Sequence, residues 1–138
     1  MTLEDAAAIA SGLPGVVIGA KWGNRTWMVG ARGFAWQRPL SKADLNRFGD
    51  EKPPSGDILA VRVENLDAKD ALLEIALPGF FTIAHFNAYP AVLIELRRAR
   101  VRDVRAAITD AWRTVSASAM ATPRKRATSR RASKRRSP

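Results

Sequence analysis

The sequence predicts an α+β protein with a largely antiparallel sheet. Three β-branched or aromatic segments follow one another within residues 15–38, which favours consecutive strands joined by a tight turn. The later helical and extended segments do not alternate strictly, as they would in a doubly wound parallel sheet. The predicted order is helix, three strands, short helix, strand, helix, two strands and helix.

The first helix is predicted from its start signal. Thr2 is followed three positions later by Asp5, which is the pattern of a capping box, and small apolar residues then recur at helical spacing up to Gly12. The Val-rich segment 15–21 predicts the first strand.

A hairpin is predicted around the sequence Gly30-Ala31-Arg32-Gly33, between strands at 26–29 and 34–38. With Ala31 and Arg32 as a two-residue loop, Trp27 lies opposite Trp36, and Arg25 lies opposite Arg38, all on one face. Two tryptophans that face a helix layer favour a place in the core. A stacking platform for nucleobases is the alternative.

The remaining elements follow from caps and periodicity. Ser41 with Asp44 predicts a brief helix that ends by Gly49, before a loop rich in proline and charge at 50–56. Strands are predicted at 58–63, 80–86 and 91–96. A helix is predicted from Asp67 up to the Pro78-Gly79 pair, with an apolar stripe formed by Ala68, Ala71, Leu72, Ile75 and Ala76. The last helix is predicted at 101–118, with a stripe formed by Val101, Val104, Ile108, Ala111, Trp112 and Val115.

The net charge of +10 is concentrated at one end of the 138-residue chain. Residues 1–118 carry 15 Lys or Arg against 13 Asp or Glu, whereas residues 119–138 carry eight cations and no acid. We therefore predict one folded domain at 1–118 and a disordered basic tail at 119–138. The tail cations are Arg124, Lys125, Arg126, Arg130, Arg131, Lys134, Arg135 and Arg136.

Composition argues against several classes of function. The chain has no cysteine and one histidine, which excludes disulfides, thiolate metal sites and two-histidine metal sites within it. It has no Walker, Rossmann or Gly-x-Ser-x-Gly pattern, so we expect neither an enzyme nor a cofactor. Because it also has no signal-peptide pattern and no long apolar run, we expect no membrane contact and a cytoplasmic location, with association with the nucleoid as an alternative.

Several motifs together resemble the MmcQ/YjbR family. They are Trp22-Gly23-Asn24-Arg25-Thr26-Trp27, Gly33-Phe34-Ala35-Trp36, the segment 80–86 with His85, Tyr89, and Asp110-Ala111-Trp112-Arg113. The resemblance covers residues 3–118 and implies a two-layer α/β sandwich of the secretion-chaperone-like kind, with helices on one face of the sheet. Its order is helix, three strands, helix, two strands and helix. It also implies DNA binding, without assigning site residues. Ala84 and Ala91 depart from the family pattern, which often has proline and glycine there.

The function predicted from these features is non-enzymatic, sequence-independent binding of double-stranded DNA by a monomer. The tail supplies electrostatic affinity for phosphates, and two basic groups supply contacts on the folded domain. One group precedes and begins the last helix, and the other lies near the hairpin. They are Arg97, Arg98, Arg100 and Arg102, extended by Arg105, and Lys21, Arg25, Arg32 and Arg38.

Simpler interpretations of the basic groups, and other functions, compete with this prediction. A cationic tail that only increases solubility and arginines that only solvate the start of a helix would look the same in sequence. A protein- or peptide-interaction module of chaperone-like fold is the alternative function. A small-molecule pocket near Trp22, His85 and Tyr89 is a third, although a lone histidine among aromatic residues more often has a half-buried structural role.

Overall fold

The computed structural model describes residues 1–21 and 23–121, and the side chains of this part as far as residue 117. Trp22 and residues 122–138, which include all eight tail cations, lie outside the described residues. The helices are α1 (Leu3–Ser11), α2 (Lys42–Asn46), α3 (Leu66–Glu74), the 3₁₀ turn η1 (Ala84–Phe86) and α4 (Val101–Ala121). The strands are β1 (Val16–Lys21), β2 (Asn24–Val29), β3 (Arg32–Gln37), β4 (Ile58–Arg62), β5 (Phe80–Phe81) and β6 (Ala91–Glu95).

The strands form one antiparallel sheet in the order β1-β2-β3-β4-β6-β5. The predicted α+β class and antiparallel sheet are confirmed, and the element order matches the order read from the residues. The order implied by the resemblance lacks one strand and one helix that the structure has.

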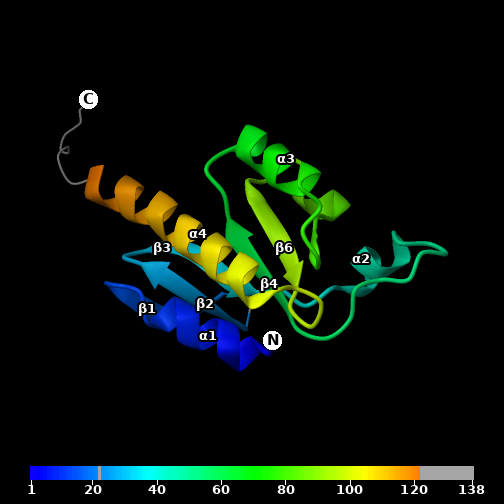
Figure 1. Ribbon diagram of the computed structural model, residues 1–138, viewed down its shortest axis with the longest axis horizontal. Helices are drawn as coiled ribbons and strands as arrows, with labels where there is room; N and C mark the ends of the chain where they lie inside the picture. Colours follow the sequence, from blue (N-terminus) through cyan, green and yellow to red (C-terminus); the bar gives the residue numbers. More distant parts are fainter. Residues whose placement is uncertain (22, 122–138) are drawn as a thin grey trace.

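Helices α1 and α4 lie side by side across one face of the sheet, and α3 lies near β6 (Figure 1). The main core fills the space between these layers and is built from alternate residues of the strands. Trp27, Leu59, Val61, Val92 and Ile94 point into it from the sheet. The predicted stripe of α4 supplies the other side, since Val104, Ile108, Ala111 and Val115 are buried, whereas Val101 at the helix start is half exposed.

Both predicted capping boxes are present. The Thr2 side chain accepts from the backbone N–H of Asp5, and the Asp5 carboxylate accepts from the backbone N–H of Thr2. Ser41 and Asp44 form the same reciprocal pair at the start of α2. These bonds satisfy backbone donors that have no partner within the helix.

The turn of the hairpin lies one residue earlier than predicted. It uses Gly30 and Ala31, so that Val29 pairs with Arg32. Gly30 has φ of +61°, a conformation that glycine adopts without steric cost and that a turn of this kind requires at its first position. The predicted loop would have placed Ala31 there.

A bulge at Phe34 then shifts the register of the hairpin. Met28 pairs with Gly33, but Trp27 pairs with Ala35, which leaves Phe34 as the extra residue. Phe34 and Ala35 are both fully buried on the side of the main core. The extra residue reverses the alternation of the strand after it.

The predicted shared face for Trp27 and Trp36 is therefore wrong. Trp27 is in the main core, whereas Trp36 packs against the cluster on the opposite face. Arg25 and Arg38 are separated in the same way. Arg25 reaches Glu4 on α1, and Arg38 lies 5.5 Å from the ring centre of Phe86 in the opposite cluster.

The segment 66–86 also departs from prediction. Helix α3 is capped by Asn65 and ends at Glu74, because Ala76 has φ of +59°. Its sheet-facing side carries Lys69 and half-buried Leu72 and Leu73, while the predicted stripe residues Ala71, Ile75 and Ala76 are exposed. The predicted strand at 80–86 is limited to Phe80–Phe81, since residues 84–86 form η1.

The last helix is longer than predicted. Helix α4 continues to Ala121, beyond the predicted end at 118. The added residues are Ala, Met and Ala, which favour continuation of a helix.

Candidate functional site

The face of the sheet opposite α1 and α4 is only partly covered. Over β4 and β6 a second, smaller core forms from Ile58, Ala60 and Leu93 with Ile83 and Phe86, the latter two from the segment around η1. Leu40 and Phe48, which flank α2, pack against the same cluster. The 3₁₀ turn η1 and the segments that flank α2 therefore pack on the other face of the sheet from α1 and α4.

A groove lies on the same face of the sheet, next to the second core. It consists of two pockets that share Lys21, Trp36 and Tyr89, one of about 230 Å³ and the other of about 610 Å³. We call it the cationic aromatic groove. The smaller pocket is also lined by Thr26, Ala31, Arg32, Gly33 and Arg62, and the larger one by Asn24, Arg38, Pro39, Leu40, Ser41, His85 and Phe86.

Strand alternation explains why these residues meet. Lys21 pairs with Asn24 between β1 and β2, and Thr26 pairs with Trp36 between β2 and β3. Trp36 in turn pairs with Ala60 of the second core. Because partners in an antiparallel pair share a face, the two-residue period brings them to one side of the sheet.

The cations of the groove differ in how they are held. Within the described residues, Lys21 and Arg32 are exposed and form no ion pair with a carboxylate. Arg62 donates to the Tyr89 hydroxyl at 3.1 Å, and its guanidinium carbon lies 5.6 Å from the centre of the Tyr89 ring. Lys21 and Arg32 are therefore the cations available to an external anion.

Three aromatic rings, those of Trp36, Phe86 and Tyr89, form the wall of the groove. The ring centres of Trp36 and Tyr89 are 6.1 Å apart at 66°, and those of Phe86 and Tyr89 are 5.4 Å apart at 72°. Both are edge-to-face contacts, which orient the rings favourably. Trp36 is half-buried, whereas 40% of the Tyr89 surface is exposed.

Lys69 of α3 forms hydrogen bonds to the backbone of the segment that carries Phe86 and Tyr89. Its ammonium group donates to the carbonyl oxygens of Phe86 and Tyr89, and the latter bond is 3.0 Å long. Burial lowers the pKa of Lys69, and the negative charge of Asp70 partly opposes this shift. Since Lys69 is itself buried, its role is to position the segment 86–89 rather than to contact a ligand.

Arg38 sits at the far end of the groove with an internal counterion. Its guanidinium lies 3.1 Å from the carboxylate of Asp44, which is buried. Burial alone would raise the pKa of Asp44, but hydrogen bonds from Ser41 and the charge of Arg38 outweigh it and lower the pKa. Arg38 is therefore largely neutralised within the domain.

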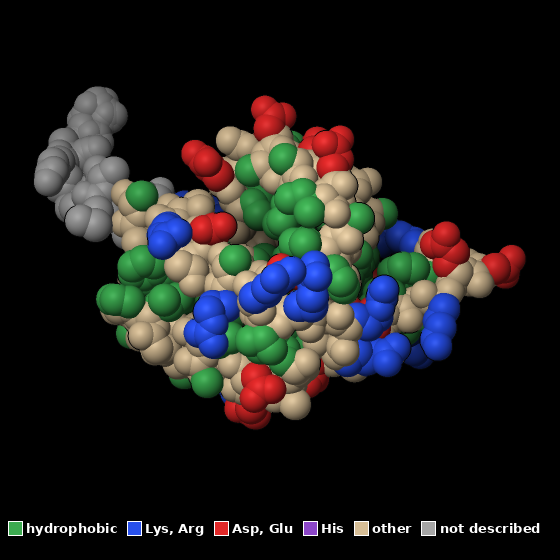
Figure 2. Space-filling view, viewed as in Figure 1, with side chains coloured by type: hydrophobic (Ala, Val, Ile, Leu, Met, Phe, Trp, Pro, Cys, Tyr) green, Lys and Arg blue, Asp and Glu red, His purple; other side chains and the backbone are tan. Residues whose placement is uncertain are grey.

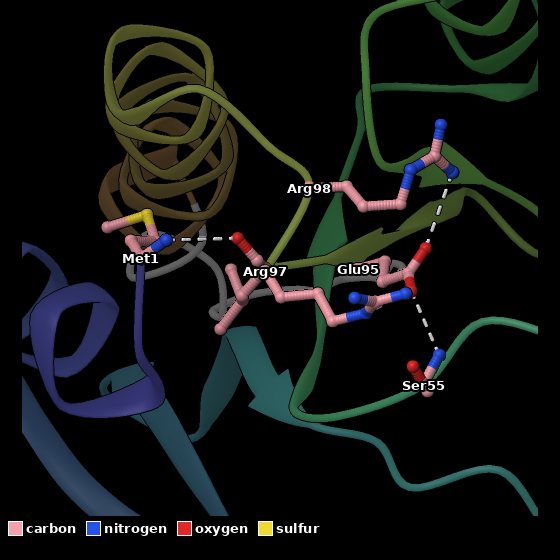
Figure 3. Close-up of polar contacts among 6 residues, drawn as sticks. Met1, Ser55, Glu95, Arg97 and Arg98 are labelled. Atoms are coloured by element: carbon pink, nitrogen blue, oxygen red, sulfur yellow. Dashed lines mark hydrogen bonds and ion pairs between the residues drawn. The ribbon is translucent and has the colours of Figure 1, made fainter.

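The basic group before α4 also lies beside a buried acid, which offsets part of its charge. The carboxylate of Glu95, only 2% exposed, accepts from the backbone N–H of Ser55 at 2.9 Å, from Arg97 at 3.0 Å and from Arg98 at 3.4 Å (Figure 3). Burial would raise the pKa of Glu95, but these hydrogen bonds outweigh it and lower the pKa. In the same region the Met1 amino group donates to the carbonyl of Leu96 at 3.2 Å.

At the start of α4, two arginines likewise lie beside one carboxylate. Arg100 lies 2.9 Å from Asp103, and Arg102 lies 3.9 Å from the same carboxylate. Lys and Arg side chains gather along α4 and the loop before it, and Asp and Glu side chains gather over α3 (Figure 2). Arg105 is exposed and has no ion pair among the described residues.

The structure thus separates the predicted site residues into three groups. Lys21, Arg32 and Arg38 line the groove together with His85 and Tyr89, while Arg25 is paired with Glu4 at 2.6 Å on the other face. The four arginines at 97–102 lie next to internal acids. His85 is exposed rather than half-buried. Trp22 and the tail cations lie outside the described residues.

Arg62 and Lys69 were missing from the predicted site, and Trp36 was named there only in the alternative of a stacking platform. Arg62 and Lys69 are single cations within a strand and a helix, a pattern that ordinarily indicates a solvated face. Trp36 had been assigned to the core, because the bulge that moves it to the opposite face has no clear signature in sequence.

Two kinds of feature are absent from the described part of the chain. No cluster of three or more His, Cys, Asp or Glu side chains there could hold a metal ion. No helix there combines the length and the apolar character that a membrane crossing requires.

Comparison with known proteins identifies mycobacterial relatives. The chain is 45% identical over 114 residues to protein Rv2570 of Mycobacterium tuberculosis and to protein Mb2600 of Mycobacterium bovis, both described as uncharacterized. The match covers 80% of this chain and 85% of each relative. No family model matches the chain, and no solved structure matches it.

Proposed function

The chain belongs to the same protein family as Rv2570 of Mycobacterium tuberculosis, and we propose that it is a non-enzymatic DNA-binding protein of the cytoplasm. In this proposal the basic tail supplies sequence-independent affinity for duplex phosphates, and the cationic aromatic groove supplies the contact of the folded domain. We also propose that the chain is a member of the MmcQ/YjbR family, on the motifs at 22–27, 33–36, 80–89 and 110–113.

The observation that carries the proposal is the charge of the groove. Four cations line it, namely Lys21, Arg32, Arg38 and Arg62, and among the described residues only Arg38 of these four forms an ion pair with a carboxylate, that of Asp44. By contrast, Glu95 and Asp103 accompany the arginines at 97–102. An anionic ligand is therefore favoured at the groove more than at the start of α4.

The tail adds an electrostatic contribution to DNA affinity, and the salt dependence of binding measures this contribution. Eight cations in 17 residues beyond Ala121 give a polycation that can follow a phosphate backbone. If about six to eight of them each replace a counterion, the logarithm of the binding constant falls with the logarithm of salt concentration with a slope of roughly −5 to −7.

The test compares the full chain with a full-length variant in which the eight tail cations are replaced by glutamine. Binding to a mixed-sequence duplex is measured by fluorescence anisotropy across a salt series. We expect tight, salt-dependent binding of the full chain and a weak residual affinity of the tail-neutral variant. Absence of binding by both proteins at low salt would overturn the proposal.

A protein-interaction function is the second candidate, and one observation favours it. Strand β1 lies at the edge of the sheet, and it exposes 51% of Val17 and 58% of Ile18. An edge strand of this kind can pair with an extended peptide. Isotope-edited NMR of the β1 amides with candidate peptides tests this alternative, because strand addition would protect the amides that face outward.

A further inference from the structure

We infer that the cationic aromatic groove receives an unpaired nucleotide, so that the folded domain prefers single-stranded nucleic acid to a blunt duplex. The inference rests on the proposed function and makes it more specific. The tail can contact phosphates of any polyanion, whereas the groove has features that only an unpaired base can use.

The first feature is the exposed aromatic wall. Tyr89 is 40% exposed, Trp36 and Phe86 contact it edge-to-face, and the Arg62 guanidinium lies 5.6 Å from its ring centre, so the orientation of the ring is fixed. In a duplex the faces of each base are covered by the neighbouring base pairs. Away from the duplex ends, a base must therefore be unpaired or extruded to stack on a protein side chain.

The second feature is the position of the cations beside this wall. Lys21 lines both pockets with Trp36 and Tyr89, and Arg32 lines the smaller pocket. Gly33 forms part of the floor, where a β-carbon would lie 3.9 Å from the Lys21 ammonium and 3.0 Å from Thr26 Cγ2. The missing side chain keeps the smaller pocket open beneath Lys21, where a phosphate can approach.

The third feature is the chemistry of the larger pocket. At about 610 Å³ it lies in the size range of small-molecule sites, and it combines apolar walls from Pro39, Leu40 and Phe86 with the polar groups of Asn24 and His85. A planar heterocycle with hydrogen-bonding edges fits such a lining. The arrangement of base pocket, aromatic wall and flanking cations is that expected for a nucleotide in a single strand.

The test uses the full chain and three labelled probes of equal length, about 12 nucleotides, which is within the range that small single-strand sites cover. The probes are oligothymidylate, the same strand made of abasic residues, and a blunt duplex. The abasic strand keeps the phosphates but removes the bases. We expect oligothymidylate to bind more tightly than the abasic strand by roughly 5- to 150-fold, which corresponds to stacking of one base.

The variant Tyr89→Ala is expected to abolish the preference for oligothymidylate over the abasic strand, because it removes the ring on which a base would stack. Tyr89→Phe is the matched control, because it keeps the ring and loses only the hydroxyl that Arg62 bonds. It should retain the preference for oligothymidylate. Since Tyr89 is partly exposed, the alanine variant is expected to fold, and circular dichroism verifies this.

Three outcomes overturn the inference. Equal binding of oligothymidylate and the abasic strand would show that bases make no contact. Equal loss of affinity for all three probes in Tyr89→Ala would show that the tyrosine acts through charge or folding. In both cases DNA binding itself would stand. Absence of binding to every probe would overturn the proposed function together with the inference.

Discussion

The buried ammonium group of Lys69 donates a hydrogen bond of 3.0 Å to the carbonyl oxygen of Tyr89. It also donates to the carbonyl of Phe86 and lies 6.0 Å from the centre of that ring. One side chain of α3 therefore fixes the segment that forms the aromatic wall. Burial of a charged group is costly unless hydrogen bonds compensate it, and these two carbonyls provide that compensation.

Replacement of Lys69 by methionine is expected to destabilise the domain. The variant keeps the length of the side chain but leaves two carbonyl oxygens without their donor, at a cost of about 1–3 kcal/mol for each unsatisfied group, reduced by the removal of a buried charge. We expect the free energy of unfolding to fall by about 2 kcal/mol in urea titrations. Lys42→Met is the control, because Lys42 is exposed. Equal stability of the two variants would contradict the role assigned to Lys69.

Stability is expected to fall in acid because of Asp44 and Glu95. The folded-state pKa of each is lower than its value in the unfolded chain, so the unfolded state binds more protons as pH falls. Their contribution is complete above the unfolded pKa and is lost as pH falls through the folded pKa. Unfolding free energies measured from pH 6 to pH 3 should decrease below about pH 5. In Glu95→Gln this decrease should be shallower, and an unchanged pH profile would exclude Glu95 as a source.

Two glycines with positive φ are expected to differ in their tolerance of alanine. At Gly30 an added β-carbon meets no atom within 4 Å, whereas at Gly79 it would lie 2.6 Å from the carbonyl oxygen of Glu95. Both substitutions incur the conformational cost of about 1–2 kcal/mol. Gly79→Ala adds a steric cost of about 1–3 kcal/mol. Thermal unfolding should therefore rank wild type above Gly30→Ala and Gly30→Ala above Gly79→Ala, and a reversed order of the two variants would count against this packing.

The two exposed arginines without internal partners allow a matched test of the interface. Arg32 lines the groove and Arg105 lies on α4, and neither forms an ion pair among the described residues. We expect Arg32→Ala to weaken DNA binding and to reduce the salt slope by about one, as loss of one phosphate contact does. Arg105→Ala should leave both quantities near the wild-type values. A larger effect at Arg105 would move the interface to α4.

Local signals in the sequence predicted most of the fold. Thr2 and Ser41 were identified as caps because a side-chain oxygen and an acid three residues later satisfy backbone donors without help from the rest of the chain. The stripe from Val104 to Val115 was identified because one helix face is buried along its whole length. The stripe on α3 was misplaced, since the buried position there belongs to Lys69, whose partners are 17 and 20 residues away in the chain.

The candidate site was less predictable for the same reason. Cations near one another in sequence, such as Arg97 and Arg98, were predicted to contact DNA from their spacing alone, and the structure adds that the buried Glu95 beside them offsets part of their charge. Lys21 and Arg62 are far apart in sequence and come together only through the pairing of four strands. Spacing along the chain does not contain that information.

The bulge at Phe34 has a consequence for how such surfaces arise. Counted from the turn in a regular ladder, Trp36 would fall on the same side as Trp27 and be sealed beneath α4. The one unpaired residue of the bulge reverses the alternation of β3, so Trp36 points to the opposite face of the sheet. A single inserted codon is thus enough to convert a core position into one that lines a surface groove, with no change in the identity of the side chain.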